Sequence, residues 1–214
     1  MDALMLPIPG TWSWKGDECD ARTHWWHPSS PWCQFMADRG IGHLCPSEPF
    51  LWSTNVNGAA FWRHSHIDWQ AGGAALTYYL ANPNTFGPHE TPEHDRNLVA
   101  HSHGLQVVLY ACAYRGLQVN RLVSVASPVR KDMAALARAA RPRIRKWAHV
   151  YSDWSDKVQW FGEWFDGQFG VARAHPMADW NYNIPKVGHS GAFKPGTMEK
   201  VWVDMGLADW LKVA

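Results

Sequence analysis

The sequence predicts an α/β protein in which helices flank a mostly parallel central sheet. Apolar segments of strand length alternate with segments of helical pattern along the chain, and such alternation is typical of βαβ units whose sheet is covered on both faces. The length of 214 residues suits one hydrophobic core, and no linker or repeat divides the chain. We therefore expect a single domain over residues 1–214, with an irregular, tryptophan-rich insert at about 153–180.

Local patterns in the first half of the chain predict one strand and two helices. Residues 3–8 form an apolar strand that a Pro-Gly pair ends. Residues 31–38 suit a short helix closed by a glycine, and residues 68–80 suit a longer helix stopped by an Asn-Pro pair. The segment 17–67 carries the weakest pattern of the chain.

The second half alternates more regularly between the two kinds of pattern. It predicts strands at 97–101, 121–126, 147–152 and about 181–187, and helices at 104–115, 130–140 and about 197–211. In parallel sheets of this kind, ligands bind at the carboxyl ends of the strands. We therefore expect a functional site among the residues just beyond the strand ends.

The charge balance excludes several classes of partner. The chain has 20 basic and 19 acidic residues, a formal net charge of +1, and no long run of either sign. Nucleic acids and anionic membranes select basic surfaces, so we expect neither as a partner and favour a small molecule. No run of 18 apolar residues predicts a transmembrane segment. The start, MDALMLPIPG, lacks the features of a secretory signal, which predicts a cytoplasmic location; the oligomeric state stays open.

The cysteine pattern argues against zinc and redox motifs, because no C-x-x-C spacing occurs. The four cysteines are Cys19, Cys33, Cys45 and Cys112. We expect reduced thiols. The alternative, for a chain that has lost a secretory leader, is a disulfide bridge among Cys19, Cys33 and Cys45.

Neither a metal nor an organic cofactor is expected. The pair Gly72-Gly73 lacks the G-x-G-x-x-G spacing of a dinucleotide site. The histidines of HETPEHD are five residues apart with a proline between them, which excludes the helical H-E-x-x-H motif. The alternative is a site in which residues 64–68 join His101 or His103, since imidazole is a common zinc ligand.

The most distinctive motif, AHSHG, lies where the strand at 97–101 meets the helix at 104–115. A serine on a sharp strand-to-helix turn needs small residues two positions to either side, because its strained backbone brings them against adjacent elements. Gly104 meets that demand and Ala100 nearly does. The alternative is that Ser102 only caps the following helix.

This pentapeptide resembles the G-x-S-x-G nucleophile elbow of the α/β-hydrolase superfamily, with alanine at the first position. The resemblance implies an α/β-hydrolase fold with Ser102 as the nucleophile. It also implies a triad in the chain order serine, acid, histidine, with the histidine in a loop near the end. Because only residues 153–180 separate the last two predicted strands, we expect a minimal cap domain or none.

Two later segments resemble the other members of that triad. Asp156, in DWSDKV, has the D-x-V form of the family's acid loop a few residues beyond a strand, and Asp153 is its competitor. Either aspartate would also suit an Asx turn or a helix cap. His189, in KVGHSGAF, lies in a loop of small residues just before the last predicted helix. Its position, rather than its residue type, selects it among 12 histidines.

The family's oxyanion hole takes one backbone N–H from the residue after the nucleophile and another from the loop after an early strand. His103 has the first position. The segment LPIPGTWSW resembles the family's H-G-x loop with proline at the histidine position. This resemblance implies Thr11 as the second donor, with Trp12 as the alternative.

The combined resemblance implies a serine ester hydrolase of carboxylesterase or lipase type that acts on a small-molecule ester or acyl substrate. Amide or thioester hydrolysis by the same triad, and a non-catalytic binding protein of this fold, are the alternatives. The chain holds 15 tryptophans, and aromatic clusters favour an acyl or aromatic ester over a highly charged one. Trp12, Trp154 and Trp160 flank the oxyanion and acid loops, so we expect them to bind substrate.

Overall fold

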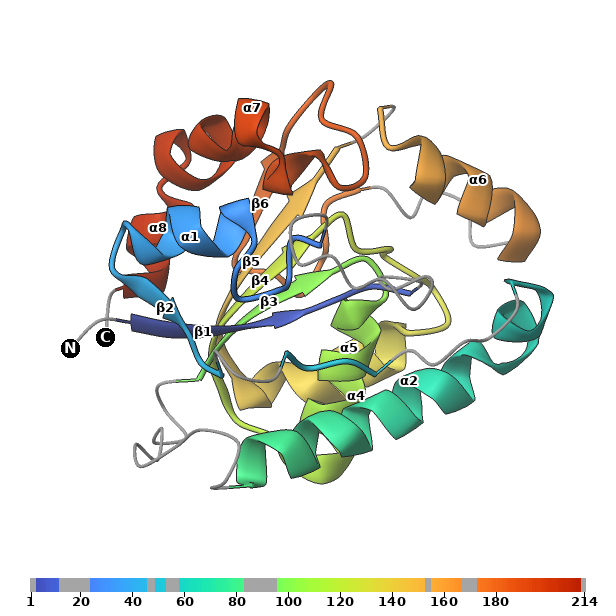
Figure 1. Ribbon diagram of the computed structural model, residues 1–214. Helices are drawn as coiled ribbons and strands as arrows, with labels where there is room; N and C mark the ends of the chain where they lie inside the picture. The colour runs from blue at the N-terminus through green and yellow to red at the C-terminus, as the bar shows by residue number, and fades with distance from the viewer. Residues whose placement is uncertain are drawn as a thin grey trace.

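Within the described residues, six parallel strands form the central sheet of the computed structural model, in the spatial order β2-β1-β3-β4-β5-β6 (Figure 1). Their bounds are β1 (Ala3–Ile8), β2 (Ile41–His43), β3 (Asn97–His101), β4 (Val119–Val125), β5 (Ile144–Tyr151) and β6 (Trp180–Asn183). The structure describes residues 3–11, 24–45, 49–52, 58–82, 96–152, 155–166 and 173–212. The predicted α/β class with a parallel sheet is confirmed.

Helices cover both faces of this sheet (Figure 1). One face packs against α2 (Gly58–Ala81), α4 (Gly104–Arg115) and α5 (Ala134–Ala140), which η2 (Arg141–Arg143) follows. The other face packs against α1 (Pro31–Ala37), η3 (Gly191–Phe193), α7 (Pro195–Met198), the π-helical η4 (Glu199–Asp204) and α8 (Leu207–Lys212). The remaining helix, α6 (Lys157–Asp166), follows β5. None of the described helices is long and apolar enough to span a bilayer.

Alternate side chains of β1 and β3 enter two separate cores, as the two-residue period of a strand requires. On β1 and β3, Leu6 and Leu98 are fully buried on the α4 side, whereas Met5 and Val99 are fully buried on the α1 side. Because helices cover both faces, β1 is apolar throughout and β3 is apolar between Asn97 and His101. That continuous apolar character is why the sequence predicts them.

Parallel pairing brings the carboxyl ends of β1, β3 and β4 to one edge of the sheet. Ile8 pairs with Ala100, and His101 pairs with Val125. Residues 9–11 after β1 and the turn after β3 are therefore neighbours in space.

The two glycines inside α2 permit its close packing on α4. A Cβ on Gly73 would lie 2.8 Å from Tyr110 Cβ and 2.9 Å from the Ala111 backbone nitrogen. A Cβ on Gly72 would lie 3.0 Å from Val107 Cγ2. The glycine pair thus serves helix packing, although glycine lowers helix propensity.

The predicted bounds agree with the structure for β1, β3 and α4, whereas other expectations are wrong. Helix α2 begins at residue 58 instead of 68, and the expected irregular insert contains α6. The expected terminal helix is divided because Gly206 has a φ of +69°, in the left-handed region that ends helices. Strand β2 was not predicted, since its three residues carry too little pattern.

Most of the described tryptophans serve the two cores. Those that are at least 98% buried are Trp26, Trp32, Trp69, Trp147 and Trp202. The described cysteines, Cys33, Cys45 and Cys112, are buried, and Cys19 lies outside the described residues. Burial raises the pKa of Cys33 and of Cys112 to about 12, so both stay protonated at neutral pH.

A buried histidine joins β4 to β5 through a chain of hydrogen bonds. Trp147 Nε1–H donates to Ser124 Oγ at 2.8 Å, and Ser124 Oγ lies 2.8 Å from His149 Nδ1. His149 Nε2 faces the Arg173 carbonyl at 3.1 Å, so Nε2 carries the proton and Nδ1 accepts from the serine. Burial lowers the pKa of His149 to about 4 because the charged ring would lose its hydration.

We expect acid to destabilise the fold through this histidine. Between an ordinary pKa of 6.5 and a folded pKa of about 4, the unfolded chain binds a proton that the folded chain does not. The free energy of unfolding should therefore fall with falling pH over this range, by up to about 1.4 kcal/mol per pH unit. His149→Gln cannot titrate, so urea denaturation at several pH values should give a shallower dependence. If the free energy of unfolding of His149→Gln depends on pH as steeply as that of the parent, His149 does not have this role.

Gly104 provides a second test of the fold, because α4 starts directly against β1. A Cβ on Gly104 would lie 2.5 Å from the Ile8 carbonyl oxygen and 2.7 Å from the Pro9 carbonyl oxygen, and both are backbone atoms. Gly104→Ala should lower the free energy of unfolding in urea by about 1–3 kcal/mol. Gly196→Ala is the control, since its Cβ would meet nothing within 4 Å. If Gly104→Ala and Gly196→Ala have the same free energy of unfolding, the backbone around Gly104 moves enough to accommodate the added methyl group.

Candidate active site

Ser102 occupies a strained turn between β3 and α4. Its φ is +52°, in the left-handed region that residues other than glycine rarely adopt. Its backbone N–H donates to the Val125 carbonyl at 3.0 Å, which ties the turn to β4. A Cβ on Gly10 would lie 2.8 Å from Ser102 Cβ, so the loop after β1 also approaches closely. The N-cap residue of α4 is His103, so Ser102 is not the cap of this helix.

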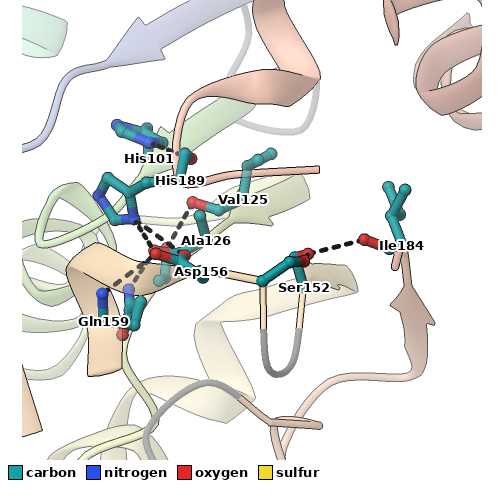
Figure 2. Close-up of polar contacts among 10 residues, drawn as sticks. His101, Val125, Ala126, Ser152, Asp156, Gln159, Ile184 and His189 are labelled. Carbon is teal, nitrogen blue, oxygen red and sulfur yellow. Dashed lines mark hydrogen bonds and ion pairs between the residues drawn. The ribbon is translucent and has the colours of Figure 1, made fainter. Parts of the chain in front are cut away.

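Asp156 is a buried carboxylate with only 1% of its surface exposed. Its Oδ2 and Oδ1 lie 2.9 and 3.1 Å from His189 Nδ1, and Oδ1 also accepts the Gln159 N–H at 3.0 Å (Figure 2). Asp156 therefore contacts His189 and also caps the start of α6. Its competitor, Asp153, lies outside the described residues.

The contact with Asp156 sets the proton position on His189. Because Nδ1 faces a carboxylate, Nδ1 carries the proton and Nε2 is left with a free lone pair. The His189 ring lies beside the end of β3, with its centroid 4.7 Å from that of His101. Ser102 Oγ and His189, both described, are not joined by a hydrogen bond; such bonds often tighten only when substrate binds.

Hydrogen bonds tie the loop after β5 to the loop after β6. Ser152 Oγ donates to the Ile184 carbonyl at 2.7 Å, and the Lys186 N–H donates to Ser155 Oγ at 3.0 Å. The two serine hydroxyls also contact each other. These bonds fix the loop that carries the carboxylate relative to the loop that carries the imidazole.

The two residues expected to form the oxyanion hole lie in contact. Thr11 Oγ1 is 2.9 Å from His103 Nδ1. Burial, together with the charge of Arg130, lowers the pKa of His103 to about 3, so its ring is neutral at physiological pH. Trp52 Nε1–H donates to the Pro9 carbonyl at 2.6 Å, which fixes the loop just before Thr11. Trp12, the alternative donor, lies outside the described residues.

A polar cluster near His103 was not predicted from the sequence. Arg130 Nη2 pairs with Asp132 Oδ2 at 2.7 Å, and His66 Nε2 lies 3.1 Å from the same oxygen. The Trp69 ring centroid is 5.1 Å from that of His103. These residues come from α2 and from the loop after β4, so no local motif reveals the set.

The alternative metal site is not assembled in the described part of the chain. His66 Nε2 contacts Asp132 and its Nδ1 lies 3.3 Å from the Tyr110 hydroxyl. Among the described side chains, no three His, Cys, Asp or Glu residues gather in a way that would hold a metal ion.

The tryptophans expected to bind substrate are only partly described. Trp160 lies on α6 with 47% of its surface exposed, whereas Trp12 and Trp154 are outside the described residues. Two other described tryptophans make aromatic contacts elsewhere in the fold. Trp25 stacks on Phe193 at 3.8 Å, and Trp180 contacts Trp210 at the amino end of β6.

Comparisons with known proteins identify the fold. No family model and no curated protein sequence matches the chain. A cold-adapted esterase from an Arctic intertidal metagenomic library aligns with a TM-score of 0.54 and 20% identity, covering 99% of this chain and 82% of the esterase. A predicted CIB-like hydrolase from Thermoplasma acidophilum aligns with a TM-score of 0.54 and 12% identity, covering 98% of this chain and 86% of its own.

A third solved structure, dienelactone hydrolase from Anabaena variabilis, aligns with a TM-score of 0.51 and 18% identity, covering 97% of this chain and 84% of its own. Each likeness extends over nearly the whole chain, including the parallel sheet and the helices on its two faces. The chain accordingly has the α/β-hydrolase fold, which the residues around Ser102 led us to expect.

Proposed function

We propose that the protein is a serine hydrolase that cleaves carboxylic esters through an acyl-enzyme, with Ser102, His189 and Asp156 as its triad. The observation that carries this proposal is the buried Asp156–His189 contact, 2.9 Å long, beside the turn that holds Ser102. A histidine whose Nδ1 proton is held by a buried carboxylate has its Nε2 available as a base. The likeness in fold to a solved esterase supports the same chemistry.

In the proposed acylation step, Ser102 Oγ attacks the ester carbonyl carbon while His189 Nε2 accepts its proton. Asp156 stabilises the resulting imidazolium and keeps its negative charge throughout. The tetrahedral intermediate then collapses, and the proton on Nε2 passes to the departing alcohol. In deacylation, His189 takes a proton from water, the hydroxide adds to the acyl carbon, and Ser102 leaves with that proton.

The oxyanion would be stabilised by the backbone N–H groups of His103 and Thr11. One such donor is worth about 2.7–4 kcal/mol in other hydrolases. The contact between the Thr11 hydroxyl and the His103 ring holds the two donor segments together. The amino end of α4, a helix of 12 residues, adds a favourable dipole.

The substrate is proposed to be a small neutral ester with an acyl or aromatic group. Trp160 follows Asp156 by one helical turn, and the backbone N–H of Trp160 donates to the Asp156 backbone carbonyl at 3.1 Å. Val158 and Phe161, 56% and 57% exposed, extend the apolar surface of α6. We also propose Trp12 and Trp154, which lie outside the described residues, as acyl-binding residues.

The triad assignment predicts a graded loss of activity. Ser102→Ala should lower kcat on p-nitrophenyl esters by about 10⁴- to 10⁶-fold without unfolding the protein. Asp156→Asn should lower kcat by about 10⁴-fold, because the amide favours the wrong imidazole tautomer. Asp153→Asn is the matched control and should have a far smaller effect. A larger loss in Asp153→Asn than in Asp156→Asn would transfer the role to Asp153.

The proposed wall predicts altered chain-length selectivity. Trp160→Ala should change the ratio of kcat/KM for long and short p-nitrophenyl esters, about tenfold for a lost contact of about 1.4 kcal/mol. Trp180→Ala is the control, because Trp180 is also partly exposed but lies at the amino end of β6. If both folded variants keep the parent's ratio, α6 does not contact the acyl group.

A further inference from the structure

His101 is the last residue of β3 and directly precedes Ser102. It is 7% exposed, and its Nε2 lies 3.0 Å from the backbone carbonyl oxygen of His189 (Figure 2). A carbonyl oxygen only accepts hydrogen bonds, so the proton of the His101 ring is on Nε2. The side chain thus links the strand of the serine to the loop of the histidine.

We propose that His101 is a positioning residue that holds His189 over Ser102 by this hydrogen bond. The inference rests on the proposed function, because it assigns His101 to the orientation of the general base. The alternative is that His101 only fills space in the core between β3 and η3.

Hydrogen bonds hold the histidine loop on either side of His189, at Ile184 and Lys186 before it and at Gly191 after it. A Cβ on Gly188 would meet nothing within 4 Å, so this stretch of backbone is not packed closely. The Gly191 N–H donates to the Gly188 carbonyl at 2.8 Å, a bond within the loop itself. Asp156 holds the His189 ring at Nδ1, and His101 holds the His189 backbone. Two anchors on different elements together fix the direction of Nε2.

The surroundings of His101 suit a neutral and rigid donor. Burial, together with the nearby charge of His189, lowers the pKa of His101 to about 3. His101 therefore stays neutral when His189 becomes charged, and it adds no repulsion. Trp25 and Phe193 hold the ring edge-on at centroid distances of 5.8 and 5.5 Å. A Cβ on Gly10 would lie 3.3 Å from His101 Nδ1, so the ring also borders the loop after β1.

The test compares two variants at this position. His101→Leu keeps an apolar side chain in the core but removes the donor, whereas His101→Gln keeps an N–H at similar reach. We expect His101→Leu to lower kcat by about 10- to 100-fold with KM nearly unchanged, as for a misplaced catalytic group. His101→Gln should recover most of this loss. If His101→Leu does not fold, His101→Asn replaces it, because its shorter amide cannot reach the His189 carbonyl.

Trp25→Phe is the matched control, because it alters the packing on the His101 ring without removing the hydrogen bond. It should keep kcat within about threefold of the parent. Three results would each overturn the proposal. The first is an equal loss of kcat in Trp25→Phe, and the second is the parent's kcat in His101→Leu or His101→Asn. The third is a folded His101→Gln variant that recovers none of the loss. Ser102→Ala is assayed in parallel. If it is inactive, the proposed hydrolase function stands even when the role of His101 is overturned. If it is fully active, both the role of His101 and the proposed function are overturned.

Discussion

The close approach between the turn after β3 and the end of β1 is the constraint on which the site depends. Gly104 faces the carbonyl oxygens of Ile8 and Pro9, and Gly10 faces Ser102 Cβ. A serine at φ +52° carries backbone strain of about 1–3 kcal/mol. Its bond to the Val125 carbonyl and the buried strands on either side hold it there. The rigid sheet thereby stabilises a turn that an isolated peptide would not adopt.

A single buried carboxylate then connects this turn to the later part of the chain. Asp156 accepts hydrogen bonds from the His189 ring and from the Gln159 backbone, so two donors offset the cost of burying its charge. The side chain of Gln159 bonds in turn to the Ala126 carbonyl at the end of β4. The position of His189 therefore depends on β4, β5 and α6 as well as on its own loop.

The sequence predicted those parts of the site that local chemistry determines. The turn at Ser102 needs small neighbours at fixed offsets, and this need is visible in a pentapeptide. The contact of His101 with the His189 loop was not predictable, because it depends on how two distant loops meet. Helix α6 was missed because Val158 and Phe161 face solvent, which obscures the helical pattern of apolar residues. Strand β2 is stabilised by pairing with β1, a tertiary contact that its own three residues do not encode.

The central claim is that His189, oriented by Asp156, activates Ser102 as a nucleophile. Its most direct test is reaction with a fluorophosphonate, which bonds to an activated serine with loss of fluoride, followed by peptide mapping of the labelled residue. We expect one phosphonyl group per chain, on the peptide that contains Ser102, and much slower labelling in folded Asp156→Asn. Labelling of a different serine, no labelling at all, or an equal rate in Asp156→Asn would contradict it.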